Sequence, residues 1–126
     1  MRWGPLALGF AVAACGGTGK GEPDLARIAA LQPPAEHQVG AILFATSCSP
    51  CHGTNATGTT QGPPLVHDYY RPGHHADAAF LVAVQRGVIA HHWRFGNMPP
   101  VPGMTSKDVA DVTAFVRWLQ RQAGID

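Results

Sequence analysis

The chain has 126 residues, a formal net charge of +1 and only 13% charged residues, about half the usual share. This length allows one domain and a tail. The low charge argues against a coiled coil or a highly charged disordered protein, and the lack of a basic run argues against nucleic-acid binding. Seven His and three Cys are the unusual features of the composition.

The N-terminal residues are typical of a targeting segment. Arg2 precedes an apolar run over residues 6–14, which is too short to span a bilayer and matches the apolar part of a secretory signal peptide. The run ends Val12-Ala13-Ala14-Cys15, which resembles the lipobox of bacterial lipoproteins, where the Cys is acylated. An ordinary signal peptide with an incidental Cys15 is the alternative. We expect residues 1–14 to be removed and Cys15 to anchor the protein by lipid in the periplasm or on the outer face of a bacterial membrane.

The next segment, residues 15–35, is rich in Gly and Pro and is predicted to be a flexible tether. Within it, residues 24–31 have the composition of one or two helical turns, too short to be stable alone. The folded domain is expected to cover residues 36–126.

Three helices are predicted in that domain from apolar periodicity and end signals. The first covers about residues 37–47, and its apolar stripe consists of Val39, Ile42, Leu43 and Thr46. The second covers 77–86, and the third covers 106–122.

The third helix has the clearest signals. Thr105 is placed to cap its N-terminus, with Asp108 three residues later, and its apolar stripe consists of Val109, Val112, Phe115, Val116 and Leu119. Long Gly- and Pro-rich loops with almost no strand pattern separate the helices, so the expected fold class is all-α. Fewer than a hundred residues with such loops bury too little apolar surface, which indicates that a cofactor completes the core.

Cys48-Ser49-Pro50-Cys51-His52 is the C-x-x-C-H pattern of covalent c-type haem attachment. The two thiols bind the haem vinyl groups, and the next residue, His52, is the proximal iron ligand. A redox dithiol would need a βαβ context, and a zinc site would need two further ligands at matching spacing. The sequence lacks both, so one covalent haem c is predicted.

Other residues are spaced around this motif in a recognisable way. Gly40 and Phe44 precede it, Gly62-Pro63-Pro64-Leu65 follows it, and Phe115 lies on the last helix. With these features, residues 36–122 resemble the class I cytochrome c family. The resemblance implies a close crossing of the first and last helices at Gly40. It also implies that the Pro63 carbonyl accepts a hydrogen bond from the proximal His, and that Leu65 packs on the haem.

The sixth iron ligand is predicted to be Met98. Gly96-Asn97-Met98-Pro99-Pro100 resembles the axial Met-Pro loop of the family, and its prolines resist regular structure. Met104 is the rival, but it immediately precedes the predicted helix cap. A thioether opposite His favours Fe(II). Full coordination leaves no open site for substrate, which favours electron transfer over catalysis.

The haem carboxylates need hydrogen-bond donors when buried. The resemblance implies Trp93 and Arg94 from the distal loop, with packing in the core as the alternative for Trp93. The pairs His74-His75 and His91-His92 are interpreted as polar surface loops. The alternative for the first pair is a copper or zinc site formed together with His67. The alternatives for the second pair are an iron ligand, a haem carboxylate partner or a pH switch.

The predicted protein is thus an all-α class I cytochrome c that carries single electrons and is not an enzyme. Docking is expected at the haem edge near Cys48 and Cys51, where the uncharged segment Thr54–Thr60 favours a short-lived apolar contact. The expected partners are redox proteins: a periplasmic dehydrogenase or respiratory complex as donor, and a reductase or oxidase as acceptor. Two alternatives stay open: a haem enzyme or gas sensor with a labile sixth ligand, and a fixed subunit of a larger oxidoreductase.

Overall fold

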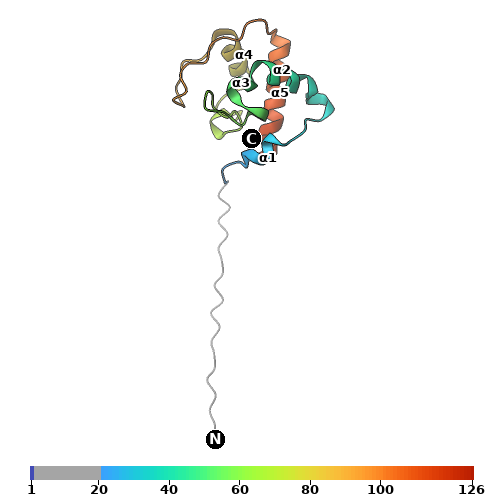
Figure 1. Cartoon of the computed structure of the whole chain (residues 1–126), viewed down its shortest axis with the longest axis vertical. Helices are drawn as coiled ribbons and strands as arrows, with labels where there is room; N and C mark the ends of the chain where they lie inside the picture. The colour runs from blue at the N-terminus through green and yellow to red at the C-terminus, as the bar shows by residue number, and fades with distance from the viewer. Residues whose placement is uncertain (2–20) are drawn as a thin grey trace.

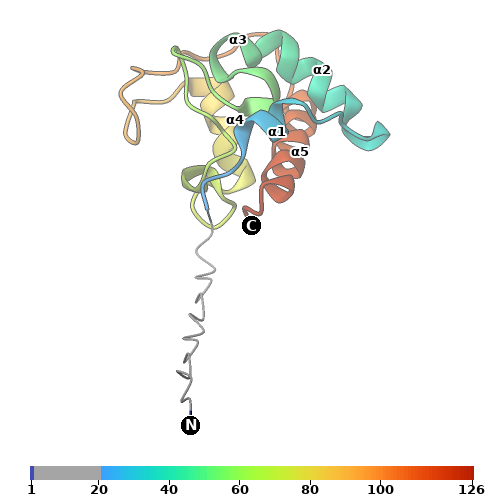
Figure 2. The same cartoon turned by 60° about the horizontal axis from the view of Figure 1, so that its bottom comes forward.

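The computed structural model describes Met1 and residues 21–126 of the chain. This part is helical, as predicted, and its only β pairing is one isolated bridge between Val88 and Met98. No helix in the described residues is long and apolar enough to cross a membrane. Figures 1 and 2 show α2 crossing α5, with α4 packed on the other side of α5. The α-helices are α1 (Leu25–Ala29), α2 (Gln38–Ser47), α3 (Ser49–His52), α4 (Asp77–Arg86) and α5 (Ser106–Gln122).

Helix α5 forms the centre of the fold and has the predicted bounds. The Thr105 hydroxyl accepts a hydrogen bond from the Asp108 N–H, and the Asp108 carboxylate accepts one from the Thr105 N–H. This reciprocal capping satisfies two backbone donors that a helix start leaves unpaired. All five residues of the predicted apolar stripe are buried: Val109, Val112, Phe115, Val116 and Leu119.

Helix α2 crosses α5 at Gly40, where a Cβ atom would lie 2.1 Å from the carbonyl oxygen of Asp111. One turn later Phe44 meets Phe115 edge to face, with ring centroids 5.8 Å apart. The predicted apolar stripe is wrong for Val39, Ile42 and Thr46, because the face that meets α5 is the one that carries the glycine, whereas Leu43 packs against the core as predicted. Val39 and Ile42 are 58% and 63% exposed.

The domain begins earlier than predicted. Helix α1 lies in the segment assigned to the tether, yet Ile28 is fully buried in the core. The Asn55 side-chain amide donates hydrogen bonds to the carbonyls of Ile28, Ala29 and Leu31. These bonds satisfy carbonyls at the end of α1, so packing and a polar cap together stabilise a helix that is too short to form alone. The predicted signal peptide and Cys15 lie outside the described residues.

Helix α4 has the predicted bounds and ends at Gly87, whose φ of +75° a residue with a side chain rarely adopts. A Cβ at Gly87 would also lie 2.5 Å from the Met98 carbonyl oxygen. The chain can therefore turn there and run back beside itself, which brings Val88 against Met98.

Candidate functional site

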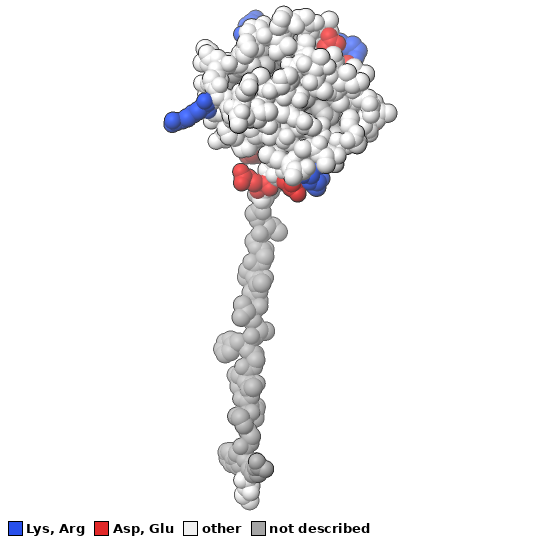
Figure 3. Space-filling model, in the orientation of Figure 1, with Lys and Arg blue, Asp and Glu red and all other residues white. Residues whose placement is uncertain are grey.

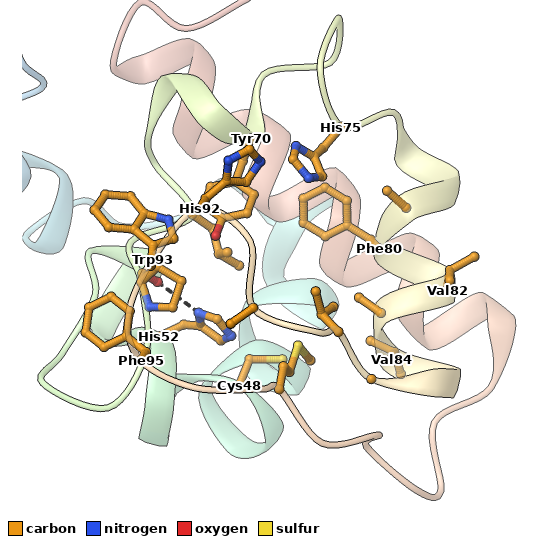
Figure 4. Close-up of a pocket in the computed structure, with 18 of the residues that line it drawn as sticks. Cys48, His52, Tyr70, His75, Phe80, Val82, Val84, His92, Trp93 and Phe95 are labelled. Atoms are coloured by element: carbon orange, nitrogen blue, oxygen red, sulfur yellow. Dashed lines mark hydrogen bonds between the residues drawn. The ribbon is translucent and has the colours of Figure 1, made fainter.

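A cavity of about 720 Å³ lies between α2, α3, α4 and the loop that follows α4 (Figure 4). Its walls are mostly apolar, and its volume lies within the usual range for small-molecule and cofactor sites. The lining includes these residues on which the sequence predictions depend: Cys48, His52, Pro63, Leu65, Trp93 and Met98.

The two cysteines lie on one helical turn at the end of α2 and in α3. Cys48 is half-buried and lines the cavity, whereas Cys51 is exposed, and neither forms a disulfide. Burial, and secondarily the neighbouring Cys51, raises the pKa of the Cys48 thiol to about 11. The loop that follows α3 is hydrogen-bonded to this turn, since the Thr59 hydroxyl donates to the Cys51 carbonyl at 2.6 Å.

The same loop brings Pro63 to the imidazole of His52. The Nδ1 atom of His52 lies 2.9 Å from the Pro63 carbonyl oxygen, to which its N–H donates (Figure 4). This hydrogen bond fixes the tautomer and leaves Nε2 with the free lone pair. Burial lowers the pKa of His52, and the bond to Pro63 opposes that change only in part. Burial thus favours the neutral imidazole, the form that ligates metals.

Met98 reaches the cavity through the isolated bridge. Its N–H donates to the Val88 carbonyl and its carbonyl accepts from the Val88 N–H, both at 2.9 Å. The Asn97 side chain accepts a hydrogen bond from the Ala90 N–H and closes the loop. Met104 does not line the cavity and packs against the hydrophobic core.

Trp93 and Arg94 differ in their placement. The Trp93 ring lines the cavity, and its Nε1–H is buried without a hydrogen-bond partner in the described structure. Tyr70 also lines the cavity, and burial raises the pKa of its phenol. The Trp93 indole N–H lies close enough to that phenol to oppose the rise in pKa, but the two groups do not reach hydrogen-bond geometry. Arg94 is exposed and does not line the cavity, so the structure does not support its predicted role at a buried carboxylate.

The two histidine pairs, expected in separate polar loops, come together at the cavity rim. His74 Nε2 and His92 Nε2 lie 3.2 Å apart. His91 behaves as expected for a polar loop, since its Nδ1–H donates to the Ile89 carbonyl at 2.9 Å. The pKa of His92 is lowered, first by loss of hydration and then by the neighbouring histidines.

Sequence analysis missed two buried polar residues of α5 that shape the cavity. The Arg117 guanidinium donates to the carbonyls of Tyr70 and His75, and Gln120 donates to those of Leu65 and Tyr70. All three of those carbonyls belong to residues that line the cavity. Arg117 and Gln120 are only 7% and 1% exposed. Their spacing along the buried face of α5 was the available signal.

The comparison with known families agrees with this geometry: residues 37–120 match the family model described as cytochrome c. The chain belongs to the cytochrome c family. Comparisons with curated proteins and with solved structures find no match. Membership implies a covalently bound haem c and a role in electron transfer rather than catalysis.

The residues present fit that cofactor. The volume and apolar walls suit a porphyrin, and Cys48 and His52 both border the cavity as attachment and ligation require. The buried Nε1–H of Trp93 lacks a partner, which is costly for an isolated donor and suits a carboxylate of the haem.

Proposed function

We propose that this cytochrome c carries single electrons and that His52 and Met98 would hold its haem iron. The observation that carries the proposal is that both side chains line the same cavity, whereas Met104 does not. The hydrogen bond from His52 to Pro63 supports it further, because it holds the imidazole in the ligating tautomer and raises its basicity.

The bound haem supplies a one-electron Fe(III)/Fe(II) couple, which a thioether ligand shifts toward Fe(II). The chain holds and shields it. Phe44, Leu65 and Phe80 form part of the apolar wall, which limits the access of water and lowers the local dielectric. With both residues bound to it, the iron would have no position left for a substrate, which favours a carrier over an enzyme.

Docking is proposed at the surface around the C-x-x-C-H turn, where Cys51 is exposed. Residues 37–67 contain no Asp, Glu, Lys or Arg, and Val39 and Ile42 of this segment are exposed. The face of the molecule in Figure 3 likewise carries charge mainly at its rim. Such a surface suits short-lived apolar contacts with redox proteins, such as a periplasmic dehydrogenase or respiratory complex and a reductase or oxidase.

The ligand set is tested by replacing each methionine. The wild-type reduced protein should be low-spin and slow to bind carbon monoxide. Met98→Ala should open the iron to rapid binding and lower the midpoint potential, and Met104→Ala, the matched control, should do neither. A bis-His spectrum in Met98→Ala would still support Met98, because a neighbouring His would have taken the vacated position. A high-spin wild-type protein would contradict the proposal and favour a haem enzyme or gas sensor.

For the location we propose a lipid anchor at Cys15 that holds the protein on the outer side of a bacterial membrane. The support is the resemblance of Val12-Ala13-Ala14-Cys15 to a lipobox. The protein should fractionate with membranes, and Cys15→Ala with a replacement signal peptide should release it, because several acyl chains give stable attachment. Mass spectrometry that finds an unmodified N-terminus at another residue would refute the anchor.

A further inference from the structure

Four of the seven histidines gather at the rim of the cavity and come from two different loops. His74 and His75 precede α4, and His91 and His92 lie in the loop between α4 and Met98. Their neighbouring ring centroids are 4.3 to 5.8 Å apart. His75 and His92 point into the same region above the cavity in Figure 4. The electron-carrier function assigns no role to this group.

Three of these residues, His74, His75 and His92, each offer one ring nitrogen, and the three atoms lie within 4.8 Å of one another. The Nε2 atoms of His74 and His92 are 3.2 Å apart. A tetrahedral zinc ion with Zn–N bonds of about 2.0–2.1 Å keeps its nitrogen ligands roughly 3.3 Å apart. These two atoms therefore already have the separation of two ligands of one ion.

The supporting contacts are also those of a metal site. The Nδ1–H of His75 donates to the Tyr69 carbonyl at 2.6 Å, so Nε2 of that ring holds the free lone pair. Metal-binding histidines usually donate their second ring N–H to a carbonyl or carboxylate in this way. The His92 ring stacks on the Tyr69 ring with centroids 4.6 Å apart. Tyr69 thus helps to orient the imidazoles of His75 and His92.

The donor set decides the class of ion. The acidic residues next to these loops, Asp68 and Asp77, are engaged by Arg71 and Arg117. The cluster therefore offers imidazole nitrogens and no free carboxylate, a donor set that suits zinc, copper or nickel and not magnesium or calcium.

We propose that His74, His75 and His92 bind one divalent transition-metal ion of the zinc type, with a fourth position open to water. Three His ligands and one open position form a known zinc arrangement. The site lies at the rim of the cavity that His52 and Met98 line and uses neither of those two residues.

The test measures zinc binding to the tag-free holoprotein in two ways. Isothermal titration calorimetry gives the affinity, and metal analysis after dialysis gives the number of ions bound per chain. Zinc is the probe because it does not change oxidation state and leaves the haem undisturbed. We expect one ion per chain, and at least a tenfold loss of affinity in His74→Ala and in His92→Ala, since even the loss of an outer-shell partner costs about 10–100-fold. His37→Ala is the matched control, because its ring packs near Trp118 outside the cluster, and it should bind zinc like wild type.

The proposal is overturned if wild type binds zinc no more tightly than the His74→Ala protein, or if His37→Ala weakens binding as much. It is also overturned if His92→Ala changes the haem spectrum while no zinc binds to wild type, which would assign His92 to the haem. Should His92→Ala fail to incorporate haem, His74→Ala decides, because His74 is exposed and does not line the cavity. The haem spectrum of the wild-type protein is recorded during the zinc titration. If it does not change, the iron keeps its ligands, and the outcome for zinc says nothing against the electron-carrier proposal.

Discussion

Replacing Gly40 with alanine should weaken the fold at the crossing of α2 and α5. The new Cβ would lie 2.1 Å from the Asp111 carbonyl oxygen and 2.7 Å from its carbonyl carbon, whereas ordinary contact begins at 3.4 Å. Both atoms belong to the backbone of α5, so neither can rotate away. The helices would have to separate by about 1.3 Å, which would also loosen the contact between Phe44 and Phe115.

The expected net cost is about 2 kcal/mol. Overpacking in a core costs about 1–3 kcal/mol, occasionally more, and a clash with rigid backbone belongs at the upper end. Alanine offsets roughly 1 kcal/mol of this through its higher helix propensity. Thermal and guanidinium unfolding of the holoprotein, followed by far-UV circular dichroism, should show a Tm lower by roughly 10 °C.

The matched control is Gly73→Ala, because a Cβ there meets nothing within 4 Å and the residue has no positive φ. Gly73→Ala should leave the free energy of unfolding unchanged or slightly raised, because alanine lowers the conformational entropy of the unfolded chain and creates no clash in the folded one. A Gly40→Ala protein as stable as wild type would refute the close crossing.

Three further outcomes test the site. Cys48→Ser combined with Cys51→Ser should leave a largely unfolded or molten chain, and a cooperative thermal transition with native helix content would contradict this. Trp93→Phe should lower the midpoint potential by up to about 40 mV, the equivalent of about 1 kcal/mol for one electron. Arg94→Gln should not change the midpoint potential. Equal potentials in the wild type and both variants would show that Trp93 does not bind a haem carboxylate. Arg117→Met should cost roughly 2–4 kcal/mol in denaturant unfolding, because it removes the donor to the His75 carbonyl and to the buried Gln120 amide oxygen. A loss below about 0.5 kcal/mol would show that Arg117 does not hold the cavity wall.

Local signals predicted the helices well. The bounds of α4 and α5 follow from periodicity and from caps such as Thr105, which depend only on nearby residues. The buried face of α2 was not predictable from hydrophobicity, because Gly40 contributes no apolar surface itself. It is buried because it lets another helix approach, so Val39 and Ile42 were misassigned.

The site likewise contains residues that local sequence predicts and residues that only the packing of distant segments brings together. Cys48, Cys51 and His52 are fixed by covalent chemistry within one helical turn, so their spacing is visible in the sequence. The gathering of His74 with His92, like the burial of Ile28 beneath Asn55, depends on which loops meet in space. No local pattern encodes such pairings.

Helix α5 fixes two walls of the cavity at once. Through Gly40 it sets the position of α2, which leads directly into the C-x-x-C-H turn. Through Arg117 and Gln120 it holds the carbonyls of three lining residues on the opposite segment. The Met98 loop is tied instead to the end of α4 by its pairing with Val88. The cavity wall that carries His52 is therefore built on the most buried helix, whereas the position of the Met98 loop depends on α4.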